Sequence, residues 1–382
     1  MKKIGKFFKW VFILLIALVI GLYVTGYGYI LKGVWVVYLH GHTTAYIDDF
    51  EFFETIEIPA STNPQPWPLH KEYNSTKATK KLSELNDTLG TVAFLIIKND
   101  SIWFEKYFDG FGKNSQTNSF SIAKSVTSAL LGKAIDDGFI KSLNQPVGDF
   151  YPQYAGTGLT VGDLSAMASG LDWNESYFNP FGMTARAYYD ADLAKTILKL
   201  KVVDTPGVNY KYLSGNTQLL AMVIQKATKK QLDDYLYESF WKPLGAENPA
   251  VWQVDDDENS LVKAYCCIGS NARDFARFGK LYKDYGKWNG QQILDSTFVA
   301  KSITPRFAES PEYGYGFWLS DYLGKKIFVM RGILGQYVIV VPEDDLIIVR
   351  LGHTIGKKTE MPFTADFYVY VEEVYEMLQK NQ

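Results

Sequence analysis

The sequence has little cysteine and histidine, and it lacks the short motifs of several common enzyme classes. Its 382 residues include two cysteines and four histidines. No His-Glu-x-x-His or Cys-x-x-Cys occurs, so a zinc enzyme has no familiar ligand set. No Gly-x-Ser-x-Gly occurs either, so a Ser-His-Asp hydrolase of that type has no visible nucleophile. His40 and His42 are closely spaced, but an interfacial or structural role fits them better than a metal site.

The chain also lacks long basic runs and spaced cysteines. Its net charge is −3 and its pI is near 5.9, which argues against nucleic acid as a partner. Cys266 and Cys267 are adjacent, and a bond between neighbours would close a small strained ring, so we expect free, buried thiols. Hydrophobic residues make up 47% of the chain, which indicates a large buried core rather than disorder.

What the N-terminus does have is the pattern of a membrane anchor. Four lysines precede an uncharged run over Val11–Ile30, which as a helix is long enough to cross a ~30 Å hydrocarbon layer. The basic flank places the N-terminus in the cytoplasm and the remainder outside the membrane. No small-x-small cleavage site follows the run, which favours an uncleaved anchor, although Gly21, Gly26 and Gly28 keep cleavage open. We expect an anchor over residues 1–30 and the lipid bilayer as a partner.

The rest of the sequence divides into a linker and one domain. A proline-rich stretch predicts an extended linker over residues 31–80, before a domain over residues 81–382. Within the domain, Thr91–Gly110 is typical of a hairpin that turns at Asn99-Asp100, and helical patterns dominate to about residue 300. Strands then return, with a hairpin at Pro342–Asp345 and a last helix from Thr364. Strands at both ends predict an α+β fold, with one antiparallel sheet and an inserted helical region.

The sequence contains Ser-x-x-Lys three times, beginning at Ser121, Ser239 and Ser260. On a helix, positions i and i+3 are neighbours, so a lysine can take or share the proton of a serine nucleophile. The copy at Ser239 precedes Pro243, where a helix ends, and the copy at Ser260 follows an acidic run at a surface turn. Ser121 opens an apolar helix that can bury Lys124 and lower its pKa. By itself the Ser-x-x-Lys pattern at Ser121 fits an ordinary helix N-cap as well as it fits a nucleophile.

Further motifs favour the nucleophile. They are "FSIAKSVTSALLGKAI", "LSAMASGLDWNESY", "YLSGNTQLL", "WKPLGAE", "NARDFARFGKLY" and "GYGFWL". From about Gly90 to Gly352 the chain resembles the serine β-lactamase-related family, in its class C β-lactamase and esterase group, and within it the 6-aminohexanoate-dimer (nylon-oligomer) hydrolases. The resemblance implies a β-lactamase/transpeptidase-like fold for the predicted α+β domain.

The matched motifs assign the functional residues of the family to positions in this sequence. The resemblance implies Ser121 as nucleophile, with Lys124 and Tyr212 as the acid/base pair. It implies an oxyanion hole from the backbone N–H groups of Ser121 and Ile333. It also places three residues beside the substrate, namely Tyr177, Ser214 and Gly332. Ser214 stands where asparagine is common, and Met330-Arg331-Gly332 stands where the lactamases have Lys-Thr-Gly.

The expected reaction is acyl transfer from a small ester, a linear amide or a peptide-like substrate, without metal or organic cofactor. Whether Lys124 or Tyr212 is the true base stays open. The alternatives are a D,D-peptidase or β-lactamase, and a catalytically silent member that binds cell-wall fragments or a partner protein. Losing the lysine of Lys-Thr-Gly predicts weak β-lactam hydrolysis.

Overall fold

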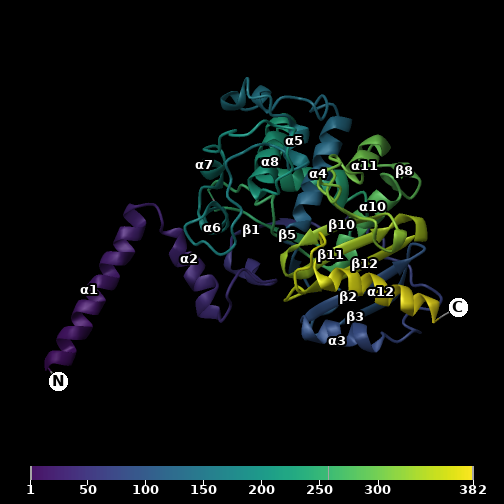
Figure 1. Cartoon of the computed structure of the whole chain (residues 1–382), viewed down its shortest axis with the longest axis horizontal. Helices are drawn as coiled ribbons and strands as arrows, with labels where there is room; N and C mark the ends of the chain where they lie inside the picture. The colour runs from purple at the N-terminus through teal and green to yellow at the C-terminus, as the bar shows by residue number, and fades with distance from the viewer. Residues whose placement is uncertain (1, 257, 381–382) are drawn as a thin grey trace.

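The N-terminal apolar run forms helix α1 (Lys2–Val24), which stands apart from the rest of the chain (Figure 1). The computed structural model describes residues 2–256 and 258–380. Helix α1 is exposed, and it is long and apolar enough to cross a membrane. The chain then turns at Gly26, whose φ is +74°, and enters α2 (Tyr29–Val36). The run predicted as one span over Val11–Ile30 is therefore divided between two helices.

Helix α2 belongs to the folded body rather than to the exposed helix. Tyr29 is buried, and its hydroxyl donates a hydrogen bond to the Pro180 carbonyl oxygen at 3.0 Å. The Arg186 guanidinium lies over the Tyr29 ring, 4.6 Å from its centroid. Arg186 belongs to α6 (Met183–Tyr189), against which α2 packs.

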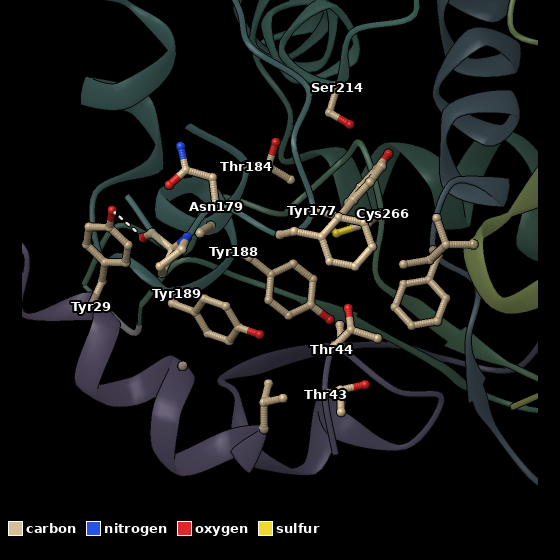
Figure 2. Close-up of a pocket in the computed structure, with 18 of the residues that line it drawn as sticks. Tyr29, Thr43, Thr44, Tyr177, Asn179, Thr184, Tyr188, Tyr189, Ser214 and Cys266 are labelled. Atoms are coloured by element: carbon tan, nitrogen blue, oxygen red, sulfur yellow. Dashed lines mark hydrogen bonds between the residues drawn. The ribbon is translucent and has the colours of Figure 1, made fainter. Parts of the chain in front are cut away.

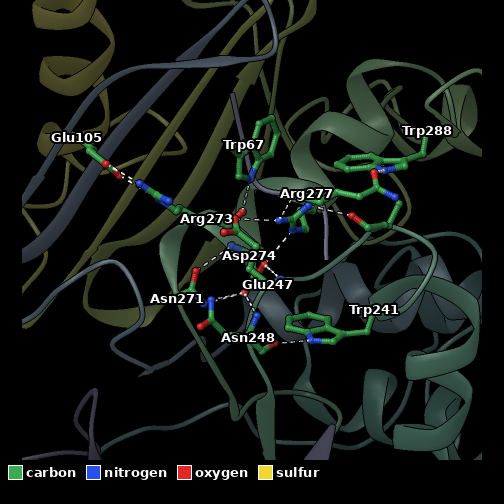
Figure 3. A network of polar contacts seen from close by, with 12 residues as sticks. Trp67, Glu105, Trp241, Glu247, Asn248, Asn271, Arg273, Asp274, Arg277 and Trp288 are labelled. Carbon is green, nitrogen blue, oxygen red and sulfur yellow. Dashed lines mark hydrogen bonds and ion pairs between the residues drawn. The ribbon is translucent and has the colours of Figure 1, made fainter. Parts of the chain in front are cut away.

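Residues 31–80, predicted as a linker, are also bound to the domain. Strand β1 (Thr55–Ile58) pairs antiparallel with β5 (Ala250–Gln253). Further along, the Trp67 indole donates to the Arg273 carbonyl oxygen at 2.9 Å (Figure 3). Only the proline-rich part of the segment is extended, and its backbone and aromatic groups have partners on the domain. The segment predicted as an extended linker is therefore packed against the domain.

A buried arginine holds this segment against the domain. Arg277 donates to the carbonyl oxygens of Gln65 and Leu244, each at 2.9 Å. Its remaining donors reach Asp274 at 2.8 Å and Glu247 at 3.1 Å, so the buried cation has two carboxylate partners (Figure 3). A buried charge is tolerated when it is paired and hydrogen-bonded in this way.

The first and last parts of the chain share one antiparallel sheet, as the sequence predicts. The Asn99-Asp100 turn closes the first hairpin, with φ of 49° and 57° at its two residues. The strand that follows the second hairpin turn pairs with the first strand of the domain. In spatial order the sheet consists of β3 (Ser101–Tyr107), β2 (Thr91–Lys98), β12 (Leu346–Gly352), β11 (Gln336–Val341), β10 (Ile327–Gly332) and β9 (Trp318–Ser320).

Helices cover both faces of this sheet (Figure 1). Alternate residues of β12 face opposite ways: Ile348 packs in the core with α3 (Lys80–Thr88) and α12 (Ala365–Gln379). Ile347 packs in the other core, with α4 (Ile122–Asp136) and α10 (Ala272–Lys283). This period-two burial explains why the strands are apolar throughout.

The region between β3 and β9 carries the remaining helices and most of a second sheet, to which β1 of the N-terminal segment adds one strand. The second sheet has the order β1, β5, β6 (Ile268–Ser270) and β4 (Thr117–Asn118), and β4 leads directly to Ser121. The other elements are α5 (Val161–Ser165), α7 (Leu193–Ile197), α8 (Ser214–Thr228), α9 (Leu232–Leu236), β7 (Lys287–Trp288), β8 (Gln291–Gln292) and α11 (Ser296–Ser302). The N-terminus of α4 lies between the two sheets, because Ser119 just before it bonds to Ile268 in β6 and contacts Gly332 at the end of β10.

Candidate active site

Ser121 precedes helix α4 at the end of a strained turn. Phe120, the residue before it, has a left-handed backbone with φ of 45°. A buried aromatic residue adopts this conformation only when its surroundings impose it. Here the Asn118 side-chain oxygen accepts a hydrogen bond from the Phe120 N–H at 3.0 Å. The Ser121 hydroxyl makes no capping hydrogen bond to the helix, so it does not act as an ordinary N-cap.

A buried carboxylate from the N-terminal segment supports this turn. Asp49 accepts hydrogen bonds from the Asn118 amide at 3.1 Å and from the Tyr188 hydroxyl at 2.8 Å. Burial raises the pKa of Asp49 to about 6. Sequence reasoning missed this residue, because nothing local distinguishes it from its neighbour Asp48.

Lys124 lies one helical turn after Ser121 and faces it. Its Nζ donates to Ser121 Oγ at 2.9 Å and to the Tyr265 carbonyl oxygen at 2.7 Å. The side chain is buried, and burial lowers the pKa of Lys124 to about 8, while the charge of Glu175 acts in the opposite direction. An amine with this pKa is unprotonated in a useful fraction of molecules near neutral pH, so it can accept a proton.

Tyr212 completes the group around the Ser121 hydroxyl. The Lys124 Nζ lies 5.1 Å from the centroid of the Tyr212 ring. Burial raises the pKa of Tyr212, and its hydrogen bond with Ser121 opposes the shift. The ring packs against Trp318 and Tyr313, with centroids 5.3 Å and 6.0 Å away. The phenol is therefore held in place and stays protonated at neutral pH.

Ser214 is tied to a carboxylate that sequence reasoning did not single out. Its hydroxyl donates to Glu175 at 2.8 Å, and its backbone N–H donates to the same carboxylate at 2.6 Å. The Trp173 indole also donates to Glu175, at 2.7 Å. Glu175 thus fixes the start of α8, and its negative charge acts on Lys124. The motif "WNESY" contains it, but the motif alone does not reveal its partners.

Tyr177, from the same motif, lies at the mouth of the site. Its side chain is 42% exposed. Partial burial and the charge of Glu175 raise the pKa of Tyr177, so its phenol is protonated at neutral pH.

Gly332 and Ile333 lie opposite Ser121, where β10 ends. A Cβ added at Gly332 would lie 2.3 Å from the Ser119 carbonyl oxygen, so only glycine permits this close approach of the strand. Met330 is fully buried in the core, and Arg331 projects the other way, as alternation along a strand predicts. The Arg331 guanidinium lies 5.0 Å from the Trp318 ring centroid and donates to the Pro362 carbonyl oxygen at 3.0 Å.

Two cavities meet at Ser121. One, of about 160 Å³, extends toward α2 and α6 and contains Lys124 and Ser214 in its wall (Figure 2). The other, of about 180 Å³, is bordered by Tyr212, Arg331 and Gly332, together with Trp318 and Ile355. Ser121, Tyr177 and Ile333 border both. The structure therefore brings all the residues proposed from the sequence to one place.

The adjacent cysteines differ from the expectation. Cys266 and Cys267 are joined by a disulfide, with their Cα atoms 3.7 Å apart, so the prediction of free thiols was wrong. The backbone of Cys267 has φ of +75°, a left-handed conformation that allows neighbouring side chains to meet. Both residues are buried, as predicted, and Cys266 borders the first cavity (Figure 2).

Comparison with known proteins identifies the family of this chain. The Beta-lactamase family model matches residues 78–368. A 6-aminohexanoate-dimer hydrolase from Paenarthrobacter ureafaciens is 27% identical over 286 residues, which cover 68% of this chain and 72% of that protein. A teichoic acid D-alanine hydrolase from Staphylococcus aureus is 25% identical over 316 residues, covering 74% of this chain and 76% of that protein.

Solved structures of other proteins share the fold of this chain. A protein from Bacillus anthracis, assigned to the 6-aminohexanoate-dimer hydrolases, superposes with a TM-score of 0.75 at 21% identity. The superposition covers 88% of this chain and 94% of the other, and it confirms the predicted β-lactamase/transpeptidase-like fold. The chain belongs to the β-lactamase family, and it is a hydrolase of the β-lactamase-related superfamily.

Proposed function

We propose that this chain is a membrane-anchored serine hydrolase that cleaves esters or linear amides through an acyl-enzyme at Ser121. The observation that carries the proposal is the 2.9 Å hydrogen bond from Lys124 Nζ to Ser121 Oγ, with Tyr212 beside both. The hydroxyl lies where two cavities meet, so a substrate can place one group on each side of its scissile bond. The relatives named above are hydrolases, which supports the reaction class.

The reaction would proceed in two steps. Ser121 Oγ attacks the carbonyl carbon while its proton passes to the Lys124–Tyr212 pair. The backbone N–H groups of Ser121 and Ile333 would stabilise the oxyanion. Tyr212 then donates a proton to the leaving group, and water releases the acyl group from Ser121 Oγ. Tyr177, Ser214 and Gly332 would border the bound substrate.

Penicillins and cephalosporins should be poor substrates, while p-nitrophenyl butyrate should be a good one. Met330 is buried and uncharged where a lysine would hold the β-lactam carboxylate, and the Arg331 guanidinium is occupied by Trp318 and Pro362. The loss of one charge-assisted contact costs roughly tenfold to a hundredfold in affinity. The measurement is kcat/KM for nitrocefin and for the ester, on the full chain in detergent.

A nitrocefin value above the ester value would contradict this assignment. It would show that the pocket binds a carboxylate, and the D,D-peptidase or β-lactamase alternative would then replace the esterase proposal. Ser121→Ala, measured on both substrates, serves as the control for background hydrolysis.

Helix α1 would hold the enzyme in the cytoplasmic membrane, with the domain on the outer side. The support is its exposed apolar length and the lysines at its start. Alkaline carbonate should leave the protein in the membrane pellet, and protease added to spheroplasts should digest the domain. A protease-protected domain would reverse the orientation, and a shortened chain released into the medium would show that the segment is cleaved.

A further inference from the structure

The two cavities at Ser121 differ in which proton donor they contain. Tyr212 borders the cavity with Trp318, Arg331 and Ile355, but it is not in the wall of the cavity near α2. The assignment of a role to each cavity rests on the proposed function, in which Tyr212 protonates the leaving group. The leaving group must then lie on the Trp318 side. The acyl group must lie in the cavity near α2, which we call the acyl pocket.

One wall of the acyl pocket is the α2 region. Residues at helical spacing line the pocket from this side: Tyr29, Ile30, Gly33, Val34 and Val37. Phe178, Pro180, Tyr188 and Tyr189 line it from the other side, and Figure 2 shows the rings of Tyr188 and Tyr189 above the α2 ribbon. Helix α2 lies outside residues 78–368, so this wall lies outside the part of the chain that matches the family model.

The lining of the pocket combines aromatic and aliphatic side chains with tyrosine and threonine hydroxyls, and it carries no acidic side chain. Among the described residues, none of those that line it is aspartate or glutamate. A terminal ammonium on the acyl group would find no carboxylate in this lining, and the charged side chain that it would meet there is Lys124, which repels it. Aromatic rings and aliphatic side chains instead favour an uncharged hydrocarbon group.

The size of the pocket limits the length of that group. Its volume is about 160 Å³, and a buried apolar cavity of about 150 Å³ is large enough to bind benzene. We propose that the enzyme selects substrates with an uncharged acyl group of about six carbons, or an aromatic acyl group of that size, and that α2 sets the length limit. Each methylene that enters such a pocket is worth about fourfold in kcat/KM.

The test is a series of p-nitrophenyl esters on the full chain in detergent. From acetate to hexanoate, kcat/KM should rise by at least tenfold, and it should fall again for decanoate. The ester of 6-aminohexanoate should be at least tenfold poorer than hexanoate at pH 7. A flat or falling series from acetate to hexanoate, or equal values for hexanoate and its amino analogue, would overturn the proposal.

Variants of α2 test the role of the helix itself. Val34→Trp should lower the hexanoate-to-acetate ratio of kcat/KM by about tenfold, because the new ring fills the pocket. Ile30→Ala should raise the decanoate-to-hexanoate ratio severalfold, a gain that misfolding cannot produce. Leu31, on the same helix, does not line the pocket, so Leu31→Trp is the matched control and should leave both ratios unchanged. Unchanged ratios in Val34→Trp and Ile30→Ala would show that α2 does not set chain length.

This inference and the proposed function fail in different ways. If the protein hydrolyses no ester at all, the proposed function is wrong. If Ser121 is acylated and acetate is hydrolysed without dependence on chain length or on α2, the proposed function stands and only the acyl pocket assignment is wrong.

Discussion

Replacing Ser121 with alanine is expected to lower kcat for p-nitrophenyl butyrate by a factor of about 10⁴ or more. The hydroxyl is the atom that the acyl group would join, and it lies 2.9 Å from Lys124 Nζ. Removing a serine nucleophile leaves only the rate enhancement that comes from binding and the oxyanion hole. The measurement is steady-state hydrolysis, together with labelling by a fluorophosphonate probe and peptide mapping of the modified serine.

The other two Ser-x-x-Lys copies are the matched controls. Ser239 lies in a single-turn π-helix, Tyr237–Trp241, and Ser260 lies in a loop with φ of 50°. Lys263 donates instead to the Tyr188 carbonyl oxygen at 2.7 Å. Ser239→Ala and Ser260→Ala should keep near-normal activity. Equal activity in all three variants, or label on another serine, would mean that Ser121 is not the nucleophile.

Lys124→Ala and Tyr212→Phe are each expected to lower kcat by roughly 10²–10⁴-fold, which is the usual contribution of a general acid or base. Both residues hydrogen-bond or contact the same hydroxyl, so they should act as a unit. The double variant should then lose little more than the worse single variant, since such effects are strongly non-additive. Losses that simply multiply would show that the two side chains act independently, and circular dichroism of each variant checks the fold.

The pH profile tests the same pair in the native enzyme. Burial lowers the pKa of Lys124 to about 8, below the usual value of a lysine. If the neutral amine accepts the serine proton, kcat/KM should be low at acid pH and rise with a midpoint near pH 8. Lys124→Ala should abolish this rise in the residual activity. A rate that is constant from pH 6 to pH 9 would exclude Lys124 as the base.

The sequence predicts those parts of the structure that depend on local pattern. The hairpin at Asn99-Asp100 and the helix after Ser121 follow from turn residues and apolar periodicity, and both are present. The family motifs then placed Lys124 and Tyr212 beside Ser121, and the structure brings them together.

What sequence reasoning missed depends on contacts between distant parts of the chain. The proline-rich segment is predicted as an extended linker from its local pattern, yet Arg277 binds the Gln65 carbonyl oxygen from 212 positions away. Asp49 and Glu175 are ordinary acidic residues until folding places Asn118 and Ser214 against them. The Cys266–Cys267 bond depends on a left-handed backbone that residue type does not reveal.

The contacts of the N-terminal segment have a consequence for the order in which the protein is completed during synthesis. Trp67 is synthesised 206 residues before Arg273, its hydrogen-bond partner. Strand β1 likewise cannot pair until β5 has been synthesised. At a translation rate of about 5–20 residues per second, the delay is roughly 10–40 s. Loop closure over this distance costs little extra free energy, because the cost grows only with the logarithm of length. Gly332, which packs against Ser119 beside the nucleophile, and β12, which pairs with β2, are made later still, so we expect activity to appear only when nearly the whole chain has been made.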